Sequence, residues 1–312
     1  MVKHGMNAVV ACALTLCAAH VGAADWYPSR YGADDLIGAA NNLSAEKVLA
    51  ASKLIKHGKT YSLGVPTGPE SPAYPPRRYS IIVIQPGMGA SGYLGSNRAT
   101  GNDDFLATYM GVGSQLDGLG HMGIEHVYYN GNKAEDFATS TGLRKLSTDK
   151  IPPLVTRGVL LDMVKLKGKR PTAGVAFNRA DIDAAAAAAK VTIEKGDIVL
   201  LHTGWLDVAD SDKARFMAGE PGLGVEGARY LASLGVVAVG ADNWAVEVLP
   251  HEDPTQAFPV HVELLPRNGV YILENMDTRA LAADAATEFL FVLGQPKFVG
   301  AVQAIINPIA IR

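Results

Sequence analysis

The stretch DIVLLH at residues 197–202, followed by VVAVGA at residues 236–241, decides the fold class. Both are short apolar runs without the alternation of a half-exposed strand, which is typical of strands buried on both faces. The segment between them, residues 224–234, has a helical pattern, and Gly235 follows it as a helix-terminating residue. A strand, a helix and a second strand in this order predict an α/β fold.

The same alternation extends outward over the rest of the chain. Apolar segments predict further strands at 79–85, 158–163, 270–273 and 288–293, and helical patterns cover 44–55 and 179–190. The proline-rich segment 65–78 predicts an extended surface loop, because proline at this density excludes a helix or a central strand. Residues 86–104, rich in Gly, Ser and Asn, predict a second loop. Since no repeat or linker interrupts the pattern, we expect one α/β domain.

Composition excludes several classes of protein. The 312 residues include 28 Lys and Arg against 31 Asp and Glu, a formal net charge of −3, so no nucleic-acid partner bound by bulk positive charge is expected. With 48% hydrophobic and 19% charged residues, the chain is neither a disordered segment nor a coiled coil.

The first 24 residues predict a secretory signal peptide. Lys3 precedes an apolar run at 8–19 that is too short to span a bilayer, and small residues lead to a cleavage site after Ala24. Cleavage removes Cys12 and Cys17, so the mature domain, 25–312, has no cysteine nucleophile, disulfide or cysteine metal ligand. We expect a periplasmic or secreted protein with no membrane span in its mature form.

A first polar cluster lies at residues 114–121 (SQLDGLGH). If its beginning is extended, Gln115 and Asp117 point to the same face, and the two glycines that follow let the chain bend and bring His121 toward them. An amide, a carboxylate and an imidazole in one small volume suit a divalent metal with an activated water, or an acid–base pair. A turn-capping aspartate and a surface histidine fit the same residues.

A second cluster contains His261 and Glu274. Glu274 ends an apolar strand, where a carboxylate is costly unless it is paired or bound to a metal. A salt-bridged glutamate and a core histidine are the alternative.

Three aromatic residues are candidates for binding a small-molecule substrate. Trp205 and Trp244 follow strand ends, where ligand pockets gather in α/β sheets, although core packing explains them equally well. Tyr128, with its neighbours His126 and Tyr129, fits a lid over the same pocket or a solvated loop. His202 continues a buried strand and is expected to be a core histidine, whereas His57 and His251 are expected at the surface.

Seven segments give the chain a recognisable pattern. It resembles the cyclase family of kynurenine formamidase-like, metal-dependent hydrolases, in one order over nearly all of the mature chain. The segments are 115–121 (QLDGLGH), 128–131 (YYNG), 196–205 (GDIVLLHTGW), 239–244 (VGADNW), 259–261 (PVH), 268–276 (NGVYILENM) and 307–310 (NPIA).

The resemblance implies a swivelling β/β/α fold with a mixed central sheet, and it implies roles for particular residues. In the family pattern H-x-G-T-H-x-D-x-P-x-H, two of the histidines and the aspartate bind a metal, and the last histidine acts in catalysis. Laid on this chain, the aspartate is Asp117 and the last histidine is His121, while the first two histidines fall on Gly111 and Gln115 and the proline on Leu119.

A longer-chain branch of the family similarly has Gln-x-Asp before the final histidine. The implied metal ligands are Gln115, Asp117, His261 and Glu274, an oxygen-rich set that favours Mn²⁺, Mg²⁺ or Zn²⁺.

The implied function is that of a secreted metal-dependent hydrolase, which cleaves a C–N or C–O bond of a small amide, lactone or cyclic amide through a metal-activated water. His121 is the expected general base. The absence of a G-x-S-x-G elbow argues against a covalent acyl-enzyme. A cyclase or dehydratase on the same site, and a metal-free periplasmic small-molecule binding protein, are the alternatives. The resemblance also implies a homo-oligomer.

Overall fold

A computed structural model of the chain describes residue 1, residues 26–84 and residues 93–312. The predicted signal peptide therefore falls almost wholly outside the described residues. No helix within the described ranges has the length and apolar character needed to cross a membrane.

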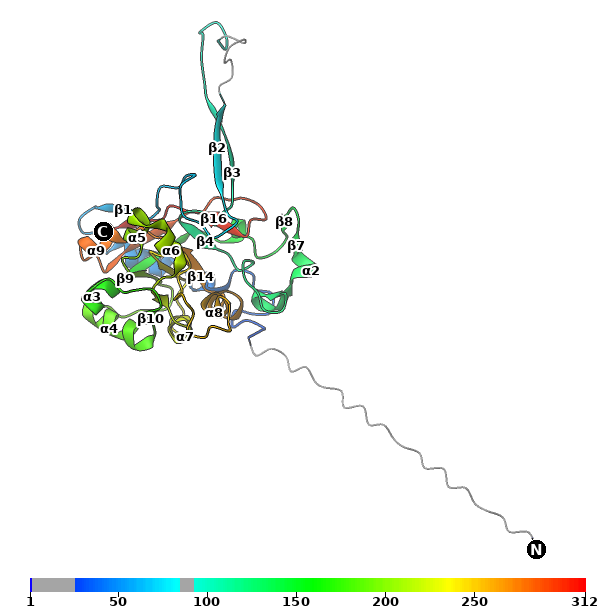
Figure 1. Ribbon diagram of the computed structural model, residues 1–312, viewed down its shortest axis with the longest axis vertical. Coiled ribbons are helices and arrows are strands. Elements are labelled where there is room, and N and C mark those ends of the chain that lie inside the picture. Colours follow the sequence, from blue (N-terminus) through cyan, green and yellow to red (C-terminus); the bar gives the residue numbers. More distant parts are fainter. Residues whose placement is uncertain (2–25, 85–92) are drawn as a thin grey trace.

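The described chain folds around a mixed sheet of nine strands (Figure 1). The four central strands are parallel to one another, and on either side each further strand pairs antiparallel with its neighbour. In spatial order the strands are β1 (Thr60–Ser62), β17 (Ile309–Ile311), β15 (Glu288–Leu293), β9 (Leu154–Asp162), β11 (Ile198–His202), β13 (Ala238–Ala241), β14 (Tyr271–Glu274), β4 (Gln115–Asp117) and β16 (Gln303–Ile305).

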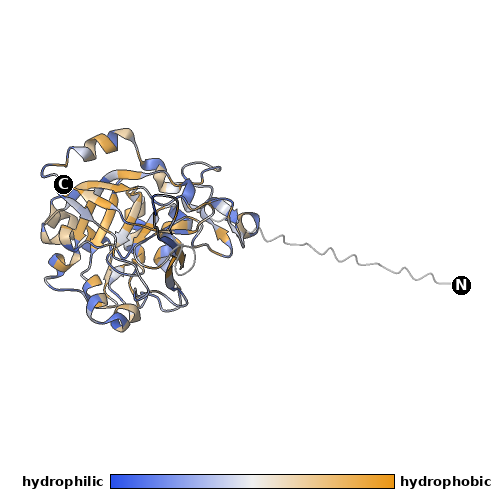
Figure 2. Ribbon diagram, turned by 90° about the horizontal axis from the view of Figure 1, so that it is seen from above, coloured by the Kyte–Doolittle hydropathy of each residue, from blue (hydrophilic) through white to orange (hydrophobic). Residues whose placement is uncertain are grey.

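Burial explains why the fold-deciding stretches form the centre of this sheet. All four residues of β13 are buried, as are the four apolar residues of β11, and Figure 2 shows the central strands as hydrophobic. Strands covered on both faces need apolar side chains at every position, and both sequences provide them. The predicted α/β class with a mixed central sheet is confirmed.

Helices cover the sheet and connect its parallel strands. α3, α4 and α7 pack against β9, β11 or one another. The helices are α1 (Ala45–Ser52), α2 (Ala134–Phe137), α3 (Met163–Lys167), α4 (Arg179–Ala189), α5 (Leu206–Ser211), α6 (Lys213–Ala218), α7 (Val225–Ser233), α8 (Pro259–Val262) and α9 (Arg279–Ala283). Four single-turn helical segments lie at η1 (Gly38–Asn42), η2 (Tyr129–Gly131), η3 (Thr148–Lys150) and η4 (Glu263–Arg267).

Local chemistry sets the helix boundaries that the sequence predicts. The Ser44 hydroxyl accepts the Lys47 N–H at 3.2 Å and so begins α1. Asn178 and Asp181 form a reciprocal capping box at the start of α4. α7 ends just before Gly235, which adopts φ +78°, the left-handed conformation that glycine takes without strain.

Four two-stranded ribbons complete the described structure. They pair β2 (Tyr79–Ile84) with β3 (Asp103–Thr108), β5 (Val127–Tyr128) with β6 (Asn132–Lys133), β7 (Ala138–Thr139) with β8 (Gly142–Leu143), and β10 (Ala176–Phe177) with β12 (Gly222–Leu223). The prediction of a loop over 86–104 is wrong at its end, because β3 begins at Asp103 and pairs with β2. The β2–β3 ribbon projects from the body as an arm (Figure 1).

Candidate functional site

The candidate site is built on β4, which pairs with the end of β14. Gln115 lies opposite Glu274 in this antiparallel pairing, and Asp117 lies opposite Ile272. Gln115 and Asp117 point to one face of the extended strand, and both are buried. The backbone register alone therefore brings the carboxylates of two distant segments to one place.

Two glycines turn the chain back after β4. The N–H of His121 donates to the carbonyl oxygen of Gly118 at 3.0 Å, which closes the turn. A Cβ on Gly118 would lie 2.8 Å from the Val302 carbonyl oxygen, so this close approach requires glycine. The bend expected from the sequence forms, and it places His121 Nε2 3.7 Å from Asp117 Oδ2.

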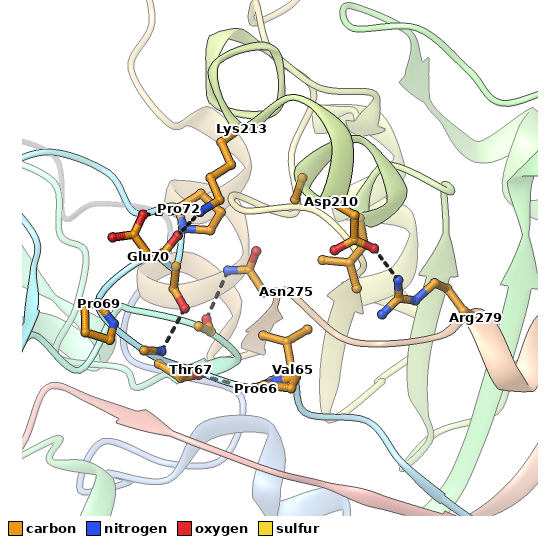
Figure 3. A pocket seen from close by; sticks show the side chains of 15 residues that line it. Val65, Pro66, Thr67, Pro69, Glu70, Pro72, Asp210, Lys213, Asn275 and Arg279 are labelled. Carbon is orange, nitrogen blue, oxygen red and sulfur yellow. Dashed lines mark hydrogen bonds and ion pairs between the residues drawn. The ribbon is translucent and has the colours of Figure 1, made fainter. Parts of the chain in front are cut away.

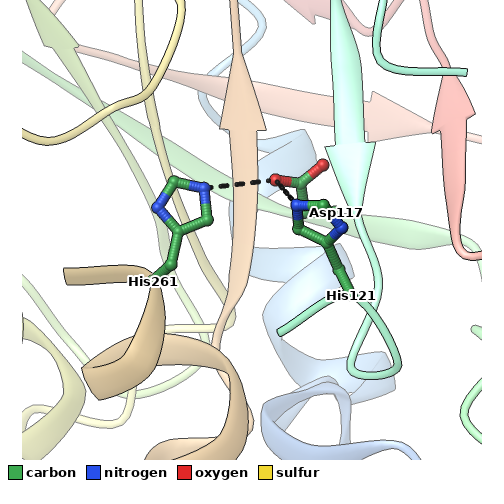
Figure 4. Close-up of side chains that lie close together, drawn as sticks. All are labelled: Asp117, His121 and His261. Atoms are coloured by element: carbon green, nitrogen blue, oxygen red, sulfur yellow. Dashed lines mark ion pairs between the residues drawn. The ribbon is translucent and has the colours of Figure 1, made fainter. Parts of the chain in front are cut away.

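His261 reaches the same carboxylate from α8 (Figure 4). Its Nε2 lies 3.5 Å from Asp117 Oδ2 and 3.2 Å from Glu274 Oε1. Its Nδ1 lies 2.5 Å from Glu247 Oε1. Since an ionised carboxylate only accepts hydrogen bonds, Nδ1 keeps its proton toward Glu247, and Nε2 is the nitrogen that would bind a metal once its own proton is lost.

The cluster holds an excess of buried negative charge. Burial raises the pKa of Glu274 to about 7, and the nearby charge of Asp117 adds to this effect. Burial also raises the pKa of Asp117, but His121 and His261 outweigh it and hold the pKa at about 2. Burial lowers the pKa of His261, whereas Asp117, Glu247 and Glu274 raise it more, to well above its usual range. A bound cation would neutralise this charge.

The donor set fits a divalent metal. Asp117, His121 and His261 each offer one ligand atom, and the three atoms lie within 4.8 Å of one another. Asp117 Oδ2 is buried without a hydrogen-bond partner among the described residues. A buried carboxylate oxygen facing two imidazole nitrogens is the arrangement that a Zn²⁺ or Mn²⁺ ion satisfies.

Gln115 links the two carboxylates through its amide nitrogen. Its Nε2 donates to Glu274 Oε2 at 2.6 Å and to Asp117 Oδ1 at 3.2 Å. Gln303 donates to the same Asp117 oxygen at 2.7 Å. The Oε1 atom of Gln115, which the sequence analysis expects as a ligand, is buried and has no hydrogen-bond partner in the described chain. A ligating role for Gln115 therefore stays a prediction.

A cavity of about 120 Å³ opens onto this cluster. Its aromatic walls come from Trp244, which stacks on Tyr74 at 5.6 Å between ring centroids, and from Phe258, whose ring meets Tyr74 edge-on. The lining residues are Tyr74, Arg77, His121, Met122, Trp244, Ala245, Phe258, His261 and Glu274.

Two of the predicted substrate-binding residues do not line this cavity. Trp205 is buried in the core, where its Nε1 donates to the Phe216 carbonyl oxygen at 3.3 Å. Tyr128 packs edge-on against Phe137. The expected lid is also wrong for Tyr129, which is buried and hydrogen-bonded to Asp35. An aromatic residue that follows a buried strand can pack in the core or line a cavity, and the sequence alone does not distinguish the two.

Glu247 and His251 support the site although their sequence context did not indicate it. Glu247 accepts the backbone N–H groups of Val260 and His261 as well as the imidazole proton, so it fixes the start of α8 and the orientation of His261. The prediction that His251 is a surface residue is wrong, because its Nδ1 lies 3.1 Å from Glu247 Oε2 and its Nε2 accepts the Phe258 N–H. A glutamate in the apolar run 244–248 is the signal that could have revealed this network.

The proline-rich segment also has a different role from the one expected. Residues 65–78 form no helix or strand, as predicted, but Tyr74 and Arg77 from this segment form walls of the cavity. The guanidinium of Arg77 donates to the Gly111 carbonyl oxygen at 3.0 Å. A Cβ on residue 111 would lie 2.4 Å from Arg77 Nη1, so glycine at this position makes room for the arginine.

A larger cavity of about 540 Å³ lies beside the other half of the proline-rich segment (Figure 3). Its charged residues are already paired: Arg279 Nη1 donates to Asp210 Oδ2 at 2.7 Å, and Lys213 donates to the Glu70 carbonyl oxygen. The smaller cavity is the candidate site because its lining carries the carboxylate–imidazole cluster.

Comparisons with known proteins bear on this arrangement. The family model Cyclase, described as "Putative cyclase", matches residues 61–248. A crystal structure of a novel cyclase is 32% identical in sequence, with a TM-score of 0.83, over 90% of this chain and 98% of that chain. Isatin hydrolase bound to the product analogue thioisatinate is 20% identical, with a TM-score of 0.62, over 86% and 98%.

A protein from Bacillus stearothermophilus described as a predicted metal-dependent hydrolase is 19% identical, with a TM-score of 0.51, over 81% of this chain and 97% of that chain. At these identities the two hydrolases show likeness of fold alone. No curated protein sequence matches the chain.

Proposed function

Because the chain belongs to the cyclase family, we propose that it is a metal-dependent hydrolase of a small amide, lactone or cyclic amide. One observation carries the proposal: Asp117, His121 and His261 converge at a cavity with aromatic walls. Asp117, His261 and Glu274 would hold the metal, and His121, which also lies within reach of such an ion, is assigned the role of base beside it. When bound, a divalent ion would polarise the substrate carbonyl and lower the pKa of a water molecule.

His121 is the proposed general base. Burial lowers its pKa, and the charge of Asp117 only partly offsets this effect, so the imidazole is neutral and able to accept a proton near neutral pH. In hydrolysis, the oxygen of water forms a bond to the carbonyl carbon while His121 takes its proton. The C–N or C–O bond then breaks, and the same proton goes to the leaving nitrogen or oxygen.

Arg77 suggests an anionic group on the substrate or product. Hydrolysis of an amide or a lactone produces a carboxylate, which a guanidinium binds with two charge-assisted hydrogen bonds. Arg77 stands in the cavity wall beside Tyr74 and Trp244, and Gly111 leaves room for it where the family pattern has a histidine. We infer a ring-shaped or aromatic substrate whose opened form carries a carboxylate.

The test combines metal analysis of the purified protein with a panel of lactones, cyclic amides and N-formyl aromatic amides, each with and without a chelator. Chelator-sensitive hydrolysis that is lost in Asp117→Asn together with the metal supports the proposal. His121→Ala should lower kcat by ~10²–10⁴ while metal content is retained. Loss of the metal in His121→Ala would make this residue a ligand instead.

Other outcomes correspond to the alternative functions. Ring closure or dehydration of the same compounds would indicate a cyclase or dehydratase on this site. Binding without metal or turnover would indicate a small-molecule binding protein.

Export is a separate part of the proposal. It rests on the predicted signal peptide at residues 1–24 and would place the enzyme in the periplasm or outside the cell. N-terminal sequencing of the protein from a periplasmic fraction should begin at Asp25, and a cytoplasmic protein with an intact N-terminus would contradict this expectation.

A further inference from the structure

His251, which the proposed reaction does not use, lies on the segment that joins β13 to α8. Its side chain is only 13% exposed. Its Nε2 accepts the backbone N–H of Phe258 at 3.1 Å, and its Nδ1 lies 3.1 Å from Glu247 Oε2. An imidazole that accepts through Nε2 is neutral and carries its proton on Nδ1, so the ring presents that proton to Glu247. One side chain therefore links a residue of the cavity wall with the carboxylate that orients His261.

The backbone of Phe258 has a conformation that its side chain disfavours. It adopts φ +48° and ψ +52°, in the left-handed region where a bulky residue is an outlier. Such a conformation persists only where the surrounding structure holds it. The N–H of Phe258 is held by His251, and its carbonyl oxygen accepts the Val262 N–H at 3.1 Å. His251 therefore supplies the contact that fixes Phe258 ahead of α8.

The conformation of Phe258 determines where its ring lies. The ring is edge-on to the rings of His251, His261 and Tyr74, with centroids 5.5, 5.4 and 6.0 Å away. Phe258 and Trp244 both line the site cavity of about 120 Å³. An apolar cavity of about 150 Å³ holds one benzene ring, so a small displacement of this wall changes what the site can hold.

The other contact of His251 supports the start of α8. Phe258, the residue before this helix, has no side-chain oxygen to accept the first N–H groups. Glu247 accepts them instead, at 3.3 Å from Val260 to Oε2 and at 3.2 Å from His261 to Oε1. His261 Nδ1 also lies against Oε1, whereas His251 lies on the Oε2 side. With donors on both oxygens, the carboxylate keeps Oε1 toward His261.

We propose that His251 is a positioning residue with two effects. Through Phe258 it places the aromatic wall of the cavity, and through Glu247 it orients His261 for metal binding. The kinetic part of the test rests on the proposed function. Metal binding and hydrogen exchange are measured on the protein without turnover.

Two substitutions separate the two contacts. The amide of glutamine reaches the former position of Nε2, so His251→Gln keeps an acceptor for the Phe258 N–H and loses the donor to Glu247. The amide of asparagine reaches the former position of Nδ1, so His251→Asn keeps the donor and loses the acceptor. His251→Leu loses both. The measurements are made near pH ~9, because the hydrogen bond to Glu247 raises the pKa of His251 and the contact with Phe258 requires the neutral ring.

Each readout should follow one of the two contacts. Zn²⁺ affinity, measured by competition with a chromophoric chelator, should fall on the order of tenfold in His251→Gln and His251→Leu and be retained in His251→Asn. Hydrogen exchange of the Phe258 amide should be on the order of tenfold faster in His251→Asn and His251→Leu and be retained in His251→Gln.

The kinetic readout uses a lactone or amide that the wild-type protein hydrolyses, at saturating Zn²⁺. KM should rise about 5–10-fold in His251→Asn and His251→Leu, since the wall is displaced. The value of kcat should stay within about twofold, because Asp117 and His121 keep their positions.

Glu252→Ala is the matched control for a structural role. Glu252 anchors the same segment from the next position, where its carboxylate accepts Asn178 Nδ2 at 2.8 Å and the Val225 N–H at 2.9 Å. Its loss should lower the urea midpoint and leave Zn²⁺ affinity, Phe258 exchange and KM at wild-type values. If Glu252→Ala changes these three quantities as much as His251→Leu does, the role of His251 is structural and the proposal is overturned.

Wild-type Zn²⁺ affinity and wild-type Phe258 exchange in His251→Leu would also overturn it. A wild-type protein that neither binds Zn²⁺ nor hydrolyses any compound would contradict the proposed function instead. In that case, faster Phe258 exchange in His251→Asn than in His251→Gln still supports the positioning of the wall, and equal exchange in the two variants refutes it.

Discussion

Replacement of Glu247 by Gln tests whether the carboxylate behind His261 tunes the metal site. The side chain keeps its shape but loses its charge and one acceptor oxygen. Glu247 now accepts the proton of His261 Nδ1 and the N–H groups of Val260 and His261, and it pairs with His251. In the variant, the new NH₂ group faces donors, so at least one of them loses its partner.

The expected effect has two parts. Loss of a partner behind a metal-binding histidine lowers metal affinity by about 10–100-fold. A buried donor left without an acceptor costs ~1–3 kcal/mol of the free energy of unfolding. Both effects are expected because Glu247 is fully buried and water cannot replace the missing acceptor.

Metal affinity is measured by competition with a chromophoric chelator, and stability by urea unfolding of the metal-free protein. Glu263→Gln is the matched control, since Glu263 follows α8 directly but pairs with the exposed Arg229 and should change neither quantity beyond ~1 kcal/mol. If Glu247→Gln binds metal as tightly as the wild type while Asp117→Asn does not bind it, Glu247 does not orient His261.

Three further outcomes are expected. Burial lowers the pKa of His202, but the hydrogen bond and charge of Asp242 raise it above its usual value. The protonated imidazole therefore stabilises the fold in full below pH ~6.5, and this contribution to the free energy of unfolding is lost as the pH rises through the raised pKa. Urea unfolding at pH 6 and pH 9 should show a larger loss in the wild type than in His202→Asn, in which the raised pKa of His261 still contributes. Gly240→Ala should lower the free energy of unfolding by ~1–3 kcal/mol, because the new Cβ would lie 2.8 Å from Leu200 Cδ2. Gly294→Ala, where no atom lies within 4 Å of the new Cβ, should unfold at the wild-type temperature. Arg77→Met should weaken inhibition by a carboxylate product by about 10–100-fold in a competition assay, and an unchanged inhibition constant would remove Arg77 from product binding.

The sequence predicts most of the central sheet because its strands need apolar residues on both faces. Residues 197–202 and 236–241 form β11 and β13 with small differences at their ends, and the family resemblance is confirmed. The β2–β3 ribbon shows the limit of this reasoning. Its first strand is predicted from its β-branched residues. The apolar character of these residues does not reveal that the strand projects from the body, so their exposure could not be predicted.

The candidate site was predicted in part. Asp117, His261 and Glu274 come together as expected, because a buried carboxylate at a strand end requires a partner. Glu247 and Arg77 could not be assigned in the same way. Each acts through a contact with a segment distant in sequence, α8 and Gly111 respectively, and only the tertiary structure brings those segments together.

The pairing of β4 with β14 and β16 separates the location of the site from its chemistry. Backbone hydrogen bonds set Asp117 opposite Ile272 on one side and Gln303 on the other. A different side chain at position 115 therefore leaves the backbone positions of Asp117 and Glu274 unchanged while it alters the groups offered to a metal. A single inserted residue within β4 would instead turn Asp117 to the opposite face of the sheet. The length of this three-residue strand is thus a stricter structural requirement of the site than the identity of its first residue.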